Sequence, residues 1–170
     1  MNYFHSLLTA RGHSLLLPQT LREDIDQFVQ HNRVGGGDYE EAPFRRRVDL
    51  WAFSILTAVA MGLDPVAPQE LQRCYRFRDT KVEMSEHLCA LLAIVWADGI
   101  ELKELDDPTS APDIIVKFAN RLAAAGCPEV IGWLKAVDLR LTPMDKLNSR
   151  AEELLTSLGL GVRTLESPHD

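Results

Sequence analysis

The sequence predicts an all-α protein, a compact bundle of about six helices. One short strand at the N-terminus is compatible with this prediction. Three observations predict this fold class. Apolar residues recur at helical spacing, Thr, Ser, Pro and Gly stand where such segments begin or end, and no repeat of fixed period or low-complexity tract appears. Residues 1–170 are expected to form a single domain around one core, with 1–81 and 82–166 as its sub-units.

The N-terminal elements are a strand and a helix. Residues 13–17 predict a short extended segment that ends at Pro18. Thr20 and Glu23 then have the spacing of a capping box. A single apolar stripe follows, which predicts an amphipathic helix: Leu21, Ile25, Phe28 and Val29. Three glycines at 35–37 end this helix, and we expect residues 33–43 to be a flexible loop.

The second helix, residues 47–61, is apolar on nearly every side, which is typical of a central helix packed by others. Gly62 ends it, and a short helix is expected at 68–75. The second half predicts further helices, at 85–98 from the Ser85 cap, at 112–126 between Pro112 and Gly126, from Pro128 to 137, and from Thr142–Pro143 to Gly159. Residues 164–170 are expected to be a frayed tail.

Charge is divided unevenly along the chain. Residues 1–81 carry ten of the 18 Lys/Arg and ten of the 25 Asp/Glu, so eight basic and fifteen acidic residues lie beyond them. The whole net charge of −7 therefore belongs to the second half, which phosphate repels. Any contact with nucleic acid is expected in the first half, at the basic clusters 45–47 and 73–81.

Cysteine usage and hydropathy predict a cytoplasmic protein. Cys74, Cys89 and Cys127 are widely spaced and lack metal-binding spacing, so we expect reduced thiols. The first residues have no basic leader followed by a long apolar run, so no signal peptide is expected. Apolar stretches of roughly 10–15 residues are shorter than the ~20 that cross a bilayer, so we expect no membrane partner.

Catalytic patterns are weak. Asp79-x-Lys81 and the set Asp98, Glu101 and Lys103 faintly resemble the core of metal-dependent nucleases, which needs carboxylates on neighbouring strands to hold Mg²⁺. Both stretches are expected in loops, so a nuclease is only the second alternative. The serines lack a nucleophile elbow, the five histidines are scattered, and no phosphate-binding glycine loop appears. We therefore expect no enzyme, no cofactor and no metal.

A cluster of arginines opens the 47–61 helix. Arg45–Arg47 oppose the helix dipole, at a cost of several tenths of a kcal/mol each, yet guanidinium groups beside free helical N–H groups favour an anion. Asp38, Glu40, Glu41 and Asp49 are candidate internal partners, and a phosphate or an acidic protein surface is the external alternative. The expected anion-, DNA- or partner-binding residues are Arg45, Arg46, Arg47, Arg73, Arg76 and Arg78.

Residues 13–61 resemble the strand–helix–helix outline of ribbon-helix-helix repressors. Those dimers read the major groove with polar side chains of a two-stranded ribbon. Here the strand offers His13 and Ser14 and then three leucines. The resemblance implies, as the first alternative, a dimeric DNA-binding transcriptional regulator in which this strand serves adhesion more than base reading.

Two longer stretches carry a second resemblance. "PFRRRVDLWAFSILTAVAMGL" (43–63) and "LDDPTSAPDIIVKFANRLAAAGCPEVIGWL" (105–134) resemble small accessory proteins encoded beside prokaryotic DNA phosphorothioation (Dnd-type) and related anti-phage defence genes. The resemblance implies a non-enzymatic component without catalytic residues that works with larger enzymes on DNA. We therefore predict an adaptor or regulatory subunit of a prokaryotic multi-protein complex, with antiviral defence as its expected setting. Its expected partners are larger proteins of the same operon, through which it would contact DNA. Whether it also forms a homodimer is left open.

Overall fold

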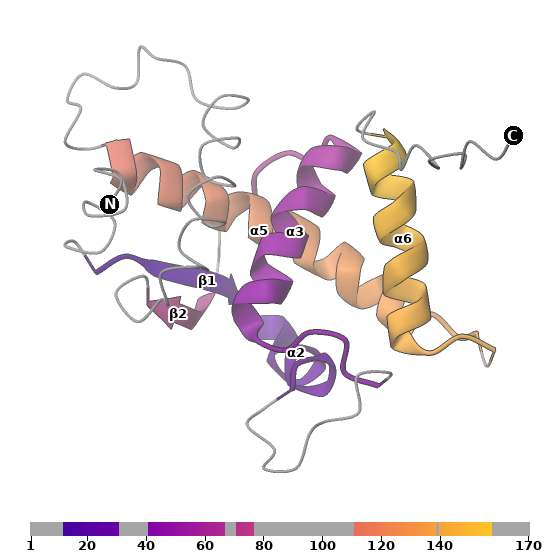
Figure 1. The fold of residues 1–170 in the computed structure, drawn as a ribbon. Coiled ribbons are helices and arrows are strands. Elements are labelled where there is room, and N and C mark those ends of the chain that lie inside the picture. The colour runs from indigo at the N-terminus through magenta and orange to yellow at the C-terminus, as the bar shows by residue number, and fades with distance from the viewer. Residues whose placement is uncertain (1–11, 31–40, 67–70, 77–110, 139, 158–170) are drawn as a thin grey trace, which may run out of the picture.

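The structure is a computed structural model that describes residues 12–30, 41–66, 71–76, 111–138 and 140–157. This part of the chain is mostly helical, which confirms the helical fold class (Figure 1). Its elements are β1 (Ser14–Pro18), the 3-10 turn η1 (Gln19–Leu21), α2 (Arg22–Phe28), α3 (Arg47–Met61), β2 (Leu71–Arg76), α5 (Ala111–Lys135) and α6 (Pro143–Ser157). The expected helix 85–98, most of the expected loop and the tail 164–170 lie outside the described residues. Among the helices described, none is long and apolar enough to cross a membrane.

The core lies where α3 crosses α5 (Figure 1). The largest fully buried side chain is Trp51 of α3, and Leu15 and Leu17 of β1 and Ile25 of α2 are also fully buried. Burying a side chain of this size stabilises the fold by about 1.5–3 kcal/mol. Residues on both sides of position 81 belong to the same cluster, so the two expected sub-units share one core.

Helix α5 continues through Gly126 and Pro128, so the prediction of two helices, one ending at Gly126 and one starting at Pro128, is wrong. Gly126 lies in the crossing with α3, where a Cβ atom would come within 1.9 Å of the backbone oxygen of Ser54. Gly126 therefore allows the backbones of α3 and α5 to approach closely, and it does not end a helix. Pro128 is exposed, and buried residues on both sides of it, such as Ala123 and Val130, pack on the same core. That packing compensates the hydrogen bond that proline cannot donate.

The two strands form an antiparallel sheet in which Ser14 pairs with Arg76 and Pro18 with Leu71. The predicted helix at 68–75 is therefore wrong, because its second half is β2. Alternate residues of β1, Leu15 and Leu17, are fully buried, and pairing with this anchored strand decides the conformation of β2. The predicted N-terminal strand is confirmed, with the register shifted between Leu15 and Leu16.

Helix ends are predicted with mixed success. Gly62 ends α3 in the left-handed conformation, with φ of 63°, which confirms that prediction. Thr142 and Asp145 form a reciprocal cap at the start of α6. The hydroxyl of Thr142, and then its backbone N–H, donate to the carboxylate of Asp145 and hold its pKa below its usual value. Thr20 does not cap α2, because a 3-10 turn intervenes and the N-cap is Leu21 without a side-chain hydrogen bond.

Candidate functional site: the basic end of α3 and the apolar face beside it

The three consecutive arginines lie at the N-terminus of α3, as their position in the sequence predicts. Arg46 is the N-cap residue, in extended conformation, and its side chain makes no capping hydrogen bond. It instead donates two hydrogen bonds to Asp49 in the first turn, Nε to Oδ2 at 3.1 Å and Nη2 to Oδ1 at 2.8 Å. Both side chains are partly exposed, at 46% and 32%, so the pair contributes about 0.2–1 kcal/mol.

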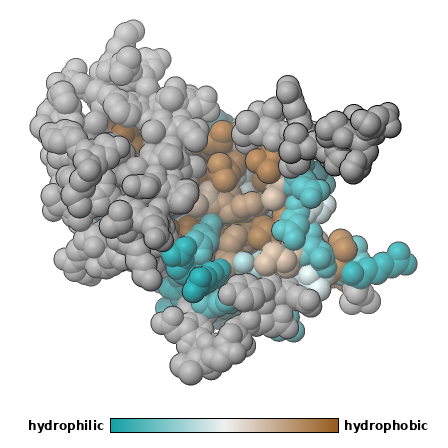
Figure 2. Space-filling model, in the orientation of Figure 1, coloured by the Kyte–Doolittle hydropathy of each residue, from teal (hydrophilic) through white to brown (hydrophobic). Residues whose placement is uncertain are grey.

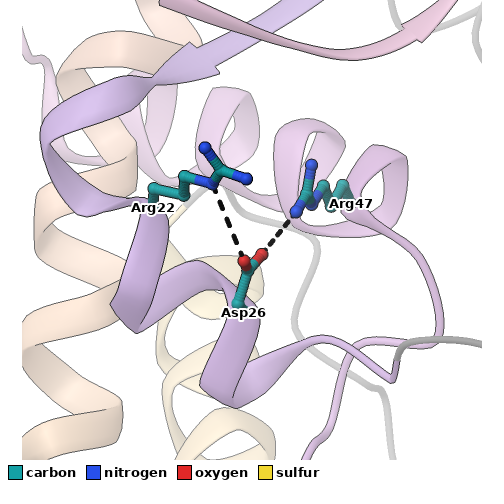
Figure 3. A network of polar contacts seen from close by, with 3 residues as sticks. All are labelled: Arg22, Asp26 and Arg47. Atoms are coloured by element: carbon teal, nitrogen blue, oxygen red, sulfur yellow. Dashed lines mark hydrogen bonds and ion pairs between the residues drawn. The ribbon is translucent and has the colours of Figure 1, made fainter.

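Arg47 turns inward and joins α3 to α2 through Asp26. Its Nη2 donates to Asp26 Oδ1 at 2.5 Å, and Arg22 Nε lies 4.0 Å from the other oxygen of the same carboxylate. Figure 3 shows the two guanidinium groups reaching Asp26 from both sides. Nε of Arg47 is buried and has no hydrogen-bond partner among the described residues. The trio carries a formal charge of +1, so Asp26 neutralises only one of the two arginines.

Asp26 is the functional neighbour that the sequence analysis missed. Of the acidic residues expected to pair with these arginines, Asp49 is confirmed, whereas exposed Glu41 forms no ion pair within the described residues. Asp38 and Glu40 lie outside the described residues. Asp26 stands 21 residues before Arg47, and no local spacing signals a contact of that length. Only its place on the polar side of an amphipathic helix, next to buried Ile25, could have suggested it.

Arg45 differs from its two neighbours. Its side chain is exposed, and within the described residues it forms no hydrogen bond or ion pair. The other expected basic residues lie elsewhere: Arg73 is exposed on β2, Arg76 lies at the end of that strand opposite Ser14, and Arg78 is outside the described residues. Arg45 is therefore the member of the 45–47 cluster that can receive an anion without first losing a partner.

An apolar face lies beside this basic end, over α3 and between α3 and α6 (Figure 2). We call it the α3–α6 face and define it by Phe53, Leu56 and Ala60 of α3 and Ala151, Leu154 and Leu155 of α6. Leu56 and Leu155 are each 39% exposed, and the other four are half-buried. Helix α3 is central, as predicted, but it is only partly covered on this side, where Leu56 is exposed.

Helix α6 is only partly buried against the rest of the fold, with Leu147 packed on the core. None of its residues is buried, although it is amphipathic. Lys146 donates its Nζ hydrogens to the carbonyl oxygens of Ala136, at 2.5 Å, and Leu134 near the end of α5. The guanidinium of Arg150 lies 5.6 Å from the centre of the Trp133 ring, a cation–π contact. The apolar side of α6 is therefore only partly buried within the protein.

Metal-binding groups do not assemble in the described residues. No cluster of three His, Cys, Asp or Glu side chains that could hold a metal occurs among them. The nuclease-like residues Asp79, Lys81, Asp98, Glu101 and Lys103 all lie outside the described part. Cys127 is buried, and that burial raises the pKa of its thiol from 9.0 to about 12, against the lowering effect of a Ser54 hydrogen bond. A thiol with so high a pKa is a poor nucleophile.

The strand of the repressor-like segment is engaged within the chain. One side of β1 pairs with β2, and Asn120 of α5 bonds to the β1 backbone as a neighbouring strand residue would. Its Oδ1 accepts from Leu16 N at 2.9 Å and its Nδ2 donates to Ser14 O at 3.1 Å. The same Oδ1 accepts from Trp51 Nε1 at 3.0 Å. This geometry gives little support to a ribbon formed between two chains.

Comparisons with known proteins add no relative. A scan against protein-family models finds no matching family, and neither the curated proteins nor the solved structures contain a match.

Proposed function

We propose that this protein is a non-enzymatic adaptor or regulatory subunit of a prokaryotic multi-protein complex, and that the α3–α6 face is where it contacts a larger protein. The observation that carries the proposal is the apolar surface between α3 and α6 in Figure 2, together with the exposure of Leu56 on α3 and of Leu155 on α6. Contiguous apolar surface of this kind is typical of protein interaction sites.

The state of α6 supports the same proposal. A helix of 15 residues is marginally stable alone in water, and in proteins packing of its apolar side stabilises it. Here that side is half-buried at best, at Ala151 and Leu154 for example. A partner that covers the α3–α6 face would complete the packing of α6, so its binding and the order of the helix are coupled.

The arginines support contact with DNA through a partner more than direct contact. Arg46 and Arg47 are each paired with a carboxylate, Asp49 and Asp26, and a phosphate would have to displace it. The chain also carries a net charge of −7, which disfavours free binding to nucleic acid. The resemblance of residues 43–63 and 105–134 to defence-associated accessory proteins supports a cytoplasmic role in antiviral defence, beside larger proteins of the same operon.

Co-purification from the native host tests this proposal. We expect a tagged protein to bring down a defined partner, identified by mass spectrometry, and the variant Leu56→Glu to lose it. The matched control is Val137→Glu, because Val137 is 92% exposed in the α5–α6 connection and outside the face. Partner loss in both variants, or in neither, contradicts the proposal.

Retention on immobilised DNA separates the alternatives. An adaptor is expected to pass through at moderate salt, whereas a DNA-binding regulator is retained with a steep dependence on salt, since each phosphate contact adds to the slope. If the purified protein is retained and the variant Arg45→Glu is not, the DNA-binding regulator is favoured.

A further inference from the structure

We propose that the α3–α6 face binds one amphipathic helix of a partner protein, whose acidic residues lie at Arg45. This inference rests on the proposed function and adds the chemistry of the partner. It follows from three features of the described residues: the continuity of the apolar face with Arg45, the hydrogen-bonding requirements of any chain that covers the face, and the charge at the start of α3.

The face and Arg45 are continuous in space. Phe53, Leu56 and Ala60 follow at i, i+3 and i+7, which places them on one side of α3. The ring of Phe53 lies 5.9 Å from that of Phe44, the residue before Arg45. Phe44 is itself fixed, because its backbone bonds to Phe28 and Gln30 after α2. Arg45 therefore follows directly on the residue that contacts the N-terminal end of the apolar stripe, and its side chain is exposed.

The covering segment is expected to be helical. The face consists of apolar side chains on two helices, α3 and α6, whose backbone groups already bond within their own helices. It therefore offers few hydrogen-bond partners to an extended chain, whose buried N–H and C=O groups would remain unpaired at a cost of about 1–3 kcal/mol each. A helix satisfies its own backbone and presents an apolar stripe at i, i+3, i+4 and i+7.

The polar side of that helix is expected to be acidic near Arg45. Asp26 and Asp49 pair with the side chains of Arg22, Arg46 and Arg47. Arg45 pairs with no carboxylate of the described residues, so its guanidinium presents an exposed positive charge at this end. The N-terminus of α3 adds its dipole of about half a positive charge. Acidic side chains reach Arg45 without breaking an existing pair. A second copy of the chain is less favoured, because two molecules with a net charge of −7 repel each other.

Binding of two synthetic peptides to the full-length protein tests the inference. Both are helical, about five turns long, with one leucine stripe. One has glutamate and the other lysine at every charged position. Fluorescence anisotropy is expected to show that Leu56→Glu and Leu155→Glu each weaken binding of the glutamate peptide about tenfold or more. Two variants are used because one could disturb folding, which circular dichroism checks. Val137→Glu is expected to leave binding unchanged.

The charge reversal Arg45→Glu separates local from overall charge. We expect it to weaken binding of the glutamate peptide about fivefold, which is the effect of one exposed ion pair. Binding of the lysine peptide is not expected to weaken. Lys117→Glu, an equal change at an exposed position of α5, is the control and is expected to have a smaller effect. No peptide binding, or equal effects of Arg45→Glu on both peptides, overturns the inference. So does sedimentation of the wild type as a dimer that Leu56→Glu dissociates, which would identify a second copy as the occupant. If co-purification still depends on Leu56 while the peptides fail, the adaptor function stands and only the partner chemistry is wrong.

Discussion

Replacement of Gly126 by alanine tests how closely α3 and α5 pack. An added Cβ would lie 1.9 Å from Ser54 O, 2.9 Å from Ser54 C and 3.1 Å from Ala58 N. All three are backbone atoms of α3, so rotation of a side chain cannot relieve the overlap. The two helices would have to move apart at the centre of the core, where Trp51 and Ile55 are fully buried.

The size of the effect follows from these distances. The shortest one falls about 1.5 Å below ordinary van der Waals contact, so a helix displacement of that order is required. Overpacking a core costs about 1–3 kcal/mol, and a collision between backbones belongs at the upper end. The higher helix propensity of alanine stabilises the folded state by about 1 kcal/mol and so offsets part of this cost. We therefore expect Gly126→Ala to lower the free energy of unfolding by about 2 kcal/mol and the Tm by about 4–8 °C.

Urea denaturation followed by circular dichroism and tryptophan fluorescence measures this change. The matched control is Gly132→Ala in the same helix, because Gly132 is exposed and an added Cβ there meets no atom within 4 Å. The control is expected to gain up to about 1 kcal/mol from helix propensity alone. Equal stability of the two variants would refute the close crossing of α3 and α5.

Four other tests examine the core by urea denaturation, thiol reactivity or pH dependence. Thr57→Val removes a buried hydroxyl that has no hydrogen-bond partner among the described residues, and it is expected to raise the free energy of unfolding by about 1 kcal/mol. A lower free energy of unfolding would show that this hydroxyl is hydrogen-bonded. Asn120→Ala leaves Trp51 Nε1 and two β1 backbone groups unpaired and is expected to lose at least about 3 kcal/mol. With Cys74 and Cys89 replaced by serine, Cys127 is expected to react with a thiol reagent near pH 8 only after unfolding. Raising the pH from about 9 to about 12 should destabilise the wild type relative to Cys127→Ala, because the thiol then ionises only in the unfolded chain.

Local signals in the sequence were enough for some elements. Helix α3 runs over the predicted residues 47–61 because its end is set by Gly62, which adopts the left-handed conformation that glycine tolerates best. The start of α6 follows from Thr142 and Asp145, whose side chains satisfy backbone N–H groups of the first turn. Both signals act within four residues, so they need no knowledge of the rest of the fold.

Other features depend on contacts between distant segments. Gly126 and Pro128 normally interrupt a helix, yet α5 continues because the residues on both sides of them pack on the same core. Strand β2 forms because β1, more than 50 residues earlier, supplies its hydrogen bonds. The exposure of Leu56 likewise depends on where α6 packs, which the apolar pattern of 47–61 does not reveal.

The arginines at the start of α3 combine both kinds of signal. Each guanidinium opposes the helix dipole by several tenths of a kcal/mol. Asp49 compensates Arg46 at i+3, which the sequence shows, whereas Asp26 compensates Arg47 only because α2 packs beside α3. An external anion at either of these arginines must compete with a carboxylate already in place. At Arg45 it meets an exposed guanidinium with no such competitor among the described residues, so recognition of an acidic partner is expected to depend more on Arg45 than on its two neighbours.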